Sequence, residues 1–295
     1  MRCDLHVHTI HSGMCTVPLM NRICRECYSR PEEVYEKLKR LGMDLVTVTD
    51  HDSIDAIEEL RRHADFFVSE EVTCHTPSGT EIHVGVYDIN DRQHVEIQRR
   101  REDLPSLLPY LREQRLFFSV NHVFSSLTGR RTVEDYEWFE REFMAFEVRN
   151  GAMPELTNAT SDRVARWMGK VGVGGSDAHA LGSVGRAYTE VRGARNKEEF
   201  FAGLRAGQGT VGGKSGDYLQ LTADVLQIGF EMMNETPWTR VLLPLALAVP
   251  AITAVNYLLE WEFSTRWLRK LAAARQIPIG DAAWWRLREQ PETSA

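Results

Sequence analysis

Short apolar runs typical of β-strands alternate with amphipathic, helix-like stretches from the N-terminus to about residue 210. The runs are rich in β-branched residues and are bounded by glycine, proline or polar residues, as strands usually are. The predicted strands are residues 2–7, 44–49, 66–72, 81–87, 116–121, 145–148, 171–174, 187–191 and 210–211. This alternation predicts parallel strands joined by crossover helices, and therefore an α/β fold.

The number of strand–helix units favours a barrel over an open sheet. Roughly seven units can be counted, and no glycine-rich phosphate-binding fingerprint follows the first strand, as it would in a dinucleotide-binding sheet. We therefore expect a barrel over residues 1–212. From residue 213 the pattern becomes helical, so residues 213–295 are expected to form a helical C-terminal extension.

Local signals place several helix boundaries in the first quarter of the chain. Ser29 to Glu32 has the pattern of a capping box, and Gly42 is a natural stop for the helix that follows. Ser53 is expected to cap a second helix that reaches about His63.

One stretch of the C-terminal region is long and apolar. Val241 to Leu259 carries no charge and is bracketed by Arg240 and Glu260, and its nineteen residues are just enough to cross a bilayer. Pro244 and Pro250 interrupt it. Two interpretations stay open: contact with a membrane, spanning or lying in the interface, or burial against another protein, including a second copy of the chain.

Composition limits the classes of partner. Hydrophobic residues make up 43% of the 295 residues and charged residues 26%, as in ordinary globular proteins, and the net charge is −7. An acidic chain has no general affinity for nucleic acid polymers, so a small phosphorylated molecule is the more suitable substrate. Five cysteines without a disulfide pattern, and an N-terminus that enters a strand directly, indicate the cytoplasm, with membrane association through 241–259 left open.

Histidines and carboxylates gather where the predicted strands end. Residues two apart on a strand point to the same side, so His6 and His8 project together from the first strand. The same is expected of the other strand-end residues, because the carboxyl ends of barrel strands meet at one mouth. The candidate metal ligands are His6, His8, His51, Glu71, His83, His122, Asp177 and His179.

Eight such groups exceed the needs of one tetrahedral ion and suit two or three ions that share a carboxylate. Imidazoles with carboxylates suit zinc, manganese or iron. Closely spaced divalent ions are a common device for hydrolysing phosphate esters, because they polarise the phosphoryl group and activate water. The sequence thus predicts a metal-dependent phosphoesterase that uses a metal-activated hydroxide.

These residues, in this order, resemble the motifs of the polymerase and histidinol phosphatase (PHP) family over about residues 1–212. The motif residues are Asp4 to Thr9 with Ser12, Thr49 to His51, Glu71, His83, His122 and Gly175 to His179. The resemblance implies a distorted (β/α)7 barrel, a di- or trinuclear metal centre and phosphoesterase chemistry.

The resemblance also implies a role for each ligand. His6, His8 and Asp177 would hold one ion together with Glu71, which would bridge to a second. His83 and His122 would complete the second site. His51 and His179 would belong to a third ion or contact the substrate phosphate, and are the candidates for the proton-donating catalytic residue.

One position departs from the family pattern. Family members often carry an aspartate where this chain has Gly13, which removes an expected ligand of the third ion. His11 is a candidate substitute. The number of ions, two or three, stays open on the sequence.

Further residues near the predicted mouth are candidates for substrate contact. Arg130 and Arg131 follow His122, and Arg186 follows the late Asp177 motif, so each could bind phosphate. The end of the 145–148 strand adds Glu147 and Asn150, which could support the ligands or touch the substrate. Nucleotide and sugar phosphates are both suitable substrates.

Two alternative functions are weighed against phosphoester hydrolysis. Amidohydrolases also place two histidines on the first barrel strand, but they usually add a bridging lysine, whereas this chain has Glu71 at that position. A catalytically inactive, membrane-associated protein of the same fold is the other alternative, and the nearly complete ligand set weighs against it.

Overall fold

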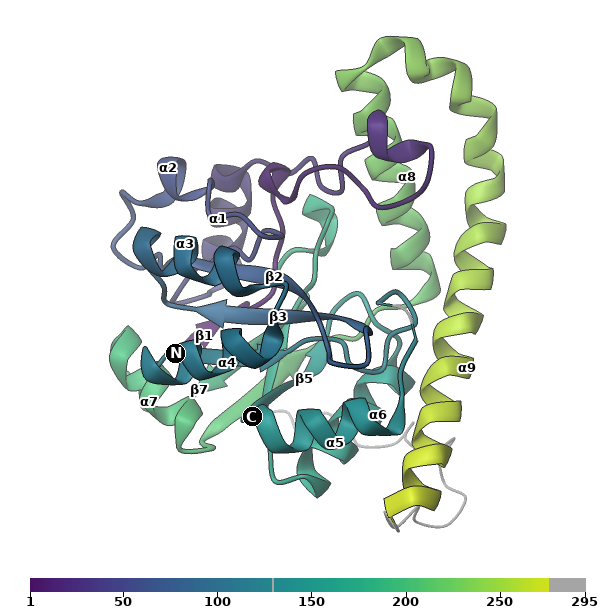
Figure 1. Cartoon of the computed structure of the whole chain (residues 1–295). Coiled ribbons are helices and arrows are strands. Elements are labelled where there is room, and N and C mark those ends of the chain that lie inside the picture. Colours follow the sequence, from purple (N-terminus) through teal and green to yellow (C-terminus); the bar gives the residue numbers. More distant parts are fainter. Residues whose placement is uncertain (129, 276–295) are drawn as a thin grey trace, which may run out of the picture.

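A five-stranded mixed sheet forms the centre of the molecule, a computed structural model that describes residues 1–128 and 130–275 (Figure 1). Strands β2 and β3 pair antiparallel, as do β3 and β4, while β4–β5 and β5–β6 are parallel. The strands in spatial order are β2 (Ser69–His75), β3 (Glu81–Tyr87), β4 (Phe117–Val120), β5 (Ala145–Asn150) and β6 (Val171–Gly175).

A second, three-stranded antiparallel sheet has the order β1-β7-β8. Its strands are β1 (Arg2–Cys3), β7 (Ala187–Val191) and β8 (Gly209–Gly213). Isolated parallel bridges join the segments between the two sheets: Val7 to Ala178, Val46 to Phe66, and His51 to Glu71. The fold is therefore mixed α/β, but regular strand pairing within the described residues does not close a barrel, and the all-parallel arrangement predicted from the alternation is wrong.

The predicted strand at 44–49 is reduced to single contacts, and side chains explain why. The Thr49 hydroxyl accepts a hydrogen bond from the Val7 amide, and the Thr47 hydroxyl donates to the Phe67 carbonyl. The Asp50 carboxylate accepts from the Thr9 amide. Backbone hydrogen bonds remain at Val46 and Thr49, and polar side chains supply the other contacts, a competition that hydrophobic patterning does not reveal.

Helices cover the sheets and connect their strands (Figure 1). The helix predicted between Ser29 and Gly42 is α1, but the helix expected to run from Ser53 to His63 is a single turn, α2. The helices are α1 (Pro31–Arg40), α2 (Ile57–Leu60), α3 (Asp91–Arg100), α4 (Leu104–Glu113), α5 (Val133–Glu142), α6 (Glu155–Trp167) and α7 (Lys197–Arg205), with short 3₁₀ turns η1 (Ile10–Ser12), η2 (Met20–Arg22) and η3 (Leu181–Ser183).

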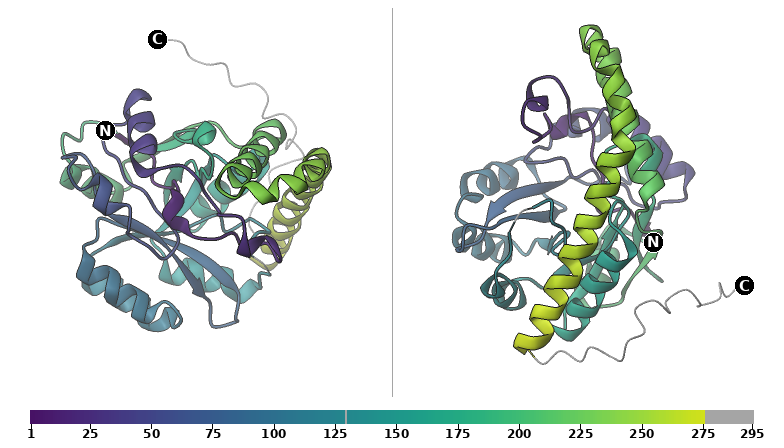
Figure 2. Two further views of the ribbon diagram at one scale, coloured as in Figure 1. Left: turned by 90° about the horizontal axis from the view of Figure 1, so that it is seen from above. Right: turned by 90° about the vertical axis from the view of Figure 1, so that its right-hand side faces the viewer.

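The C-terminal region is a helical hairpin beside the body of the molecule (Figures 1 and 2). It consists of α8 (Tyr218–Glu235), the 3₁₀ helix η4 (Pro237–Ala248) and α9 (Val249–Arg275). By length and composition, Pro237–Ala274 could cross a membrane, although the same test is passed by some helices of soluble proteins. The remainder of the predicted extension, 276–295, lies outside the described residues.

The second half of α9 is part of the main hydrophobic core. Phe263, Trp267 and Leu271 are buried and share one cluster with Phe124 and Tyr136 of the body. Burial of these large side chains fixes α9 firmly against α5 and α6. The extension therefore has no core of its own at this end.

Candidate metal centre

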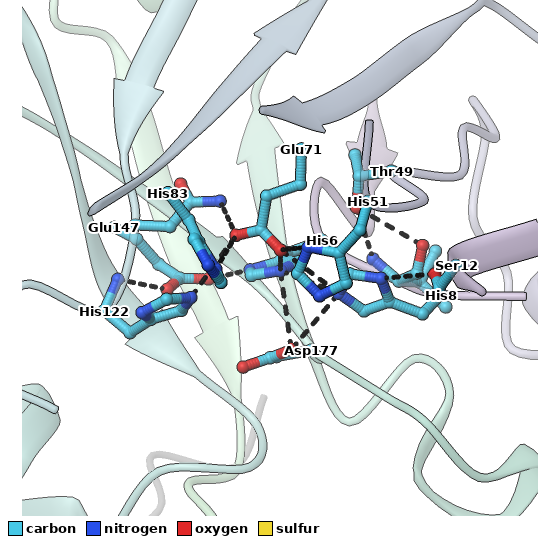
Figure 3. A network of polar contacts seen from close by, with 12 residues as sticks. His6, His8, Ser12, Thr49, His51, Glu71, His83, His122, Glu147 and Asp177 are labelled. Atoms are coloured by element: carbon cyan, nitrogen blue, oxygen red, sulfur yellow. Dashed lines mark hydrogen bonds and ion pairs between the residues drawn. The ribbon is translucent and has the colours of Figure 1, made fainter. Parts of the chain in front are cut away.

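Residues from four separate parts of the chain meet at one buried site (Figure 3). His6 and His8 enter from the N-terminal segment, and Glu71 from β2, whose neighbour β3 contributes His83. His122 follows β4 and Asp177 follows β6. The structure thus brings together the strand-end residues predicted from the sequence. Four overlapping groups could each hold a metal ion: His6–His8–Asp177, His6–Glu71–His122, His51–Glu71–His83 and His8–His51–His179.

Glu71 lies at the middle of the site, with its two carboxylate oxygens facing different histidines (Figure 3). Its Oε2 is 3.1 Å from Nε2 of His6 and 3.4 Å from Nε2 of His8. Its Oε1 is 3.5 Å from Nδ1 of His83 and 3.3 Å from Nε2 of His122. One carboxylate therefore stands between two sets of imidazoles, the arrangement of a bridging ligand.

The first of these sets is completed by Asp177. Its Oδ1 lies 3.4 Å from the Nε2 atoms of both His6 and His8, which are themselves 3.1 Å apart. Ligand atoms around one tetrahedral ion lie roughly 3.4 Å apart, because each is about 2.1 Å from the metal. His6, His8 and Asp177 are therefore spaced as ligands of a single ion, with Glu71 beside both histidines.

Hydrogen bonds on the outer side orient both N-terminal histidines. His6 donates from Nδ1 to Glu147 at 2.8 Å, which points Nε2 at Glu71. His8 donates from Nδ1 to the Ser12 hydroxyl at 3.0 Å, which in turn donates to Asp50 at 2.7 Å. Partners of this kind orient metal-binding imidazoles and raise their basicity.

Asn150 and Glu147 also hold other parts of the site. The Asn150 amide donates to Asp177 Oδ2 at 2.9 Å and to Glu147 Oε2 at 3.0 Å. Glu147 Oε2 also accepts from the backbone amide of His122 at 2.9 Å. Both residues thus stand behind the ligands, in the supporting position that the sequence left open for them.

The electrostatics of the site favour a cation. Burial would raise the pKa of Glu71, but the imidazoles of His6 and His83 hold it well below its usual range. Burial opposes protonation of His6, yet Glu71 and Asp177 outweigh it and raise the pKa of His6. Burial lowers the pKa of His8 to about 3, and the nearby His179 contributes to this shift. The site thus combines ionised carboxylates with a neutral imidazole, as metal ligation requires.

Several polar atoms here have no hydrogen-bond partner although they are buried. Glu71 Oε2, His83 Nδ1, His122 Nδ1 and His179 Nε2 are all in this state. An unsatisfied buried polar atom costs roughly 1–3 kcal/mol, more when it is charged. Binding of divalent ions by Glu71 and His83 would satisfy their free atoms, so the residues present fit a metal centre.

Glu26 is a site residue that sequence reasoning missed. Its Oε1 lies 3.7 Å from Nε2 of both His51 and His179. Its backbone amide donates to the Gly13 carbonyl at 3.0 Å, so the loop folds back and brings this carboxylate beside the position where the family often has aspartate. The sequence contained one signal for this residue, Gly13 at the position where the family often has aspartate. The absence of that aspartate suggests that another carboxylate of the same loop takes its place.

His11 does not take the place of that aspartate. Its Nε2 faces Glu59 at 3.7 Å, and His11 belongs to none of the four candidate groups formed by the described residues. The substitution suggested by the sequence is therefore not supported by the position of this side chain.

The predicted phosphate-binding arginines have other partners. Arg131 is buried, and its guanidinium donates to the carbonyls of Glu81, Val123 and Thr128. Arg186 donates to the Ser215 carbonyl and to Asp217. The side chain of Arg130 is exposed. Their role in substrate binding stays a prediction, and the contacts of Arg131 and Arg186 are those of residues that hold loops.

The chain is similar to known proteins in part of its sequence and in its fold. Residues 155–208 match a sequence family described as PHP-associated. No curated protein matches the chain. Among solved structures it is similar to PsfC from Pseudomonas syringae, with a TM-score of 0.54 and 18% identity over 80% of this chain and 98% of that one. At this identity the likeness shows a shared fold.

Two further solved structures are more distant. The lesion-specific endonuclease EndoQ from Pyrococcus furiosus gives a TM-score of 0.48 and 18% identity over 70% of this chain and 56% of that one. A proposed metal-dependent phosphoesterase from Bifidobacterium adolescentis gives a TM-score of 0.43 and 12% identity over 69% and 96%.

The family match coincides with part of the site. Residues 155–208 contain α6, β6 and the segment with Asp177 and His179, the last of the motifs found in the sequence. The earlier motifs meet these two residues at the same centre. The segment that carries Asp177 and His179 is therefore similar to a PHP-associated sequence family.

Proposed function

We propose that the protein is a metal-dependent phosphoesterase. The observation that supports this most is the position of Glu71, whose two oxygens face separate sets of imidazoles. Paired divalent ions supply polarisation of the phosphoryl oxygens and activation of a water molecule. The chain's own residues would hold and orient these ions and exclude bulk water from the buried side of the site.

The proposed ligands divide as the family resemblance implies. His6, His8 and Asp177 would hold one ion with Glu71, and His83 with His122 would hold the second on the other side of that carboxylate. A third position is formed by His51 and His179, with Glu26 as the carboxylate. Zinc, manganese and iron all suit this combination of nitrogen and oxygen donors.

Protonation of the leaving group falls to a histidine at the rim. Of the two candidates, His179 lines the large cavity next to the centre, together with Asp177 and Glu26. Burial lowers the pKa of His51 well below its usual range, so this imidazole is neutral and is a weaker choice for a proton donor. We therefore assign the donor role to His179 when only two ions are bound.

The finer features of fold and location belong to the same proposal. The two sheets and the bridges between them are consistent with a distorted (β/α)7 barrel over residues 1–212. We place the protein in the cytoplasm, with the C-terminal extension available for contact with a membrane. Amidohydrolase chemistry is the weaker alternative, because a carboxylate, Glu71, stands at the bridging position.

A substrate panel tests the proposal. Purified full-length protein loaded with manganese or zinc is assayed against phosphate mono- and diesters, including nucleotides and sugar phosphates, with His8→Ala as the control. We expect release of phosphate or alcohol from at least one ester, reduced at least about a hundredfold in the variant. Equal release by the two proteins, or none, would contradict a phosphoesterase.

A further inference from the structure

A cavity of about 540 Å³ opens directly from the metal centre. One end is lined by Glu26, Asp177 and His179, and the rest lies between the loop around Cys15 to Cys24 and the helical hairpin. The loop is fixed to the hairpin by the ion pair of Arg25 with Glu235 at 2.8 Å. This volume is that of an ordinary ligand site.

The cavity wall is mainly apolar away from the metal centre. On α8 most residues from Leu221 to Met233 line it, whereas η4 and the start of α9 contribute residues three to four apart, which form one stripe. The polar residues of this part of the lining are Arg25, Asp224, Asn256, Tyr257 and Glu260. The apolar lining includes Val17, Met20, Leu221, Val225, Ile228, Met232, Met233, Leu242, Leu245, Val249 and Ile252.

Such a wall does not suit a nucleotide or a sugar phosphate. Both carry several hydroxyl or ring nitrogen atoms that would lose their hydrogen bonds to water against aliphatic side chains. A phosphate at the metal centre joined to an apolar chain in the cavity leaves no such atom unsatisfied. The site therefore matches an amphiphilic phosphate ester.

The outer face of the hairpin is also apolar, and it is exposed. Leu247 is 87% and Leu258 63% exposed, and no charged residue occurs between Arg240 and Glu260. The further exposed apolar residues here that do not line the cavity are Trp238, Val241, Leu243, Val255, Leu259 and Trp261. Figure 2 shows this face along one side of the molecule, with no element of the body covering it.

The position of the hairpin favours an interfacial arrangement over a spanning one. The second half of α9 is anchored in the core through Trp267 and Leu271, so it is not free to enter a bilayer. Glu235 at the end of α8 and Arg240 in the first turns of η4 are both exposed, and a spanning arrangement would have to move them across the membrane. An apolar helix face lying in the headgroup region fits both facts.

We propose that the substrate is a phosphorylated lipid, a phosphate ester of an apolar alcohol, taken from a membrane surface on which the hairpin lies. This inference rests on the proposed phosphoesterase function and names its substrate class. For a monoester, water attacks phosphorus, the bond from phosphorus to the lipid oxygen breaks, and a proton moves to that oxygen. The products are the lipid alcohol and inorganic phosphate.

A chain-length series tests the cavity in solution. Full-length, manganese-loaded protein is assayed with butyl, hexyl and octyl phosphate below their micelle-forming concentrations, and with glycerol 3-phosphate. We expect kcat/KM to rise at least about tenfold from butyl to octyl phosphate, because each added methylene leaves water for an apolar wall. Equal rates along the series would overturn the inference and leave the phosphoesterase intact, whereas no release from any ester would contradict the phosphoesterase itself.

Variants locate the effect within the hairpin. Val225→Asp and Ile252→Asp place a charge in the cavity wall and should reduce the ratio of octyl to butyl phosphate turnover at least about tenfold. Leu219→Asp is the matched control, since Leu219 is an exposed apolar residue of α8 that does not line the cavity. A ratio unchanged in both wall variants would exclude this cavity as the chain-binding site.

Flotation with phosphatidylcholine vesicles, with and without phosphatidic acid, tests the outer face. The full-length protein should float with the vesicles, and the double variant Leu247→Glu, Leu258→Glu should stay in the soluble fraction. Sedimentation velocity tests the alternative, in which a second copy of the chain covers this face. If the protein is a soluble dimer that does not bind vesicles, and the double variant is a monomer, this face is a dimer interface. That result would overturn the membrane part of the proposal.

Discussion

Glu70 and Glu71 are neighbours on β2, yet their side chains have different surroundings. Residues next to each other on a strand point to opposite sides. Glu71 faces the imidazoles of the metal centre, whereas Glu70 accepts hydrogen bonds from His94 at 2.9 Å and Gln98 at 2.7 Å. The pair thus provides a matched comparison of a proposed metal ligand with a buried carboxylate outside the proposed centre.

Glu71→Gln should remove the bridging charge while it keeps the size of the side chain. Bound metal, measured by mass spectrometry of the purified protein, should fall by at least one equivalent per chain, and turnover by at least about a hundredfold. The Glu70→Gln variant should bind as much metal per chain as the unsubstituted protein. Equal metal content in both variants would contradict the bridging role.

Glu26→Gln tests the third position. If Glu26 holds an ion with His51 and His179, protein that binds three equivalents of manganese should bind two after this substitution, because an amide is a weaker ligand than a carboxylate. Glu59→Gln, which alters the partner of His11 instead, is the control. If the Glu59→Gln variant loses metal and the Glu26→Gln variant does not, His11 and not Glu26 would be the residue that holds the third ion.

His94 should make the stability of the protein depend on pH. Its hydrogen bond to Glu70 raises the pKa of His94, so the contribution to stability is present below the ordinary value of about 6.5 and is lost as pH rises through the folded value. The loss of unfolding free energy in His94→Gln should be about 1 kcal/mol near pH 6 and smaller above pH 8. A difference that does not vary with pH in urea titrations would contradict this.

At the scale of elements, α9 has two halves with different environments. Leu271 is fully buried in the main core, whereas Leu258, thirteen residues earlier in the same helix, is 63% exposed. Leu271→Ala should destabilise the protein by about 2–5 kcal/mol because it leaves a cavity. Leu258→Ala should change the free energy of unfolding by less than about 0.5 kcal/mol. Similar urea midpoints for the two variants would contradict the docking of α9.

Elements with strong local signals were predicted well, and those held by long-range contacts were not. The helix α1 begins at Pro31, two residues after Ser29, and ends two residues before Gly42, close to the predicted start and stop. The segment 44–49 has the composition of a strand, but Thr47 and Thr49 use their hydroxyls where a regular ladder would form. Pairing direction and barrel closure depend on such contacts, which a periodic pattern does not encode.

At the scale of the whole molecule, the same distinction applies to the site. The eight predicted ligands are brought together because strand ends converge, a consequence of topology that the sequence order already contained. Glu26 was missed because it lies in a loop, and its place depends on the hydrogen bond to Gly13. The cavity was missed because it forms only when α8 and α9 pack beside that loop.

The overall arrangement assigns separate tasks to the two parts of the chain. Residues 1–212 contain the proposed metal ligands, and the proposed extension from residue 213 forms most of the apolar wall next to them. A substrate would therefore meet charge at one end and hydrocarbon at the other. Since the extension also presents its outer face to solvent, the molecule joins the metal centre to a surface suited to a membrane.

Crystallography of manganese-loaded protein at a wavelength that gives anomalous scattering tests the central claim most directly. Two anomalous peaks are predicted, one on each side of Glu71 and about 3.5–4 Å apart, the first next to His6, His8 and Asp177 and the second next to His83 and His122. A fully loaded protein with no peak at Glu71, or with a single ion that Glu71 does not contact, would contradict the metal centre proposed for this chain.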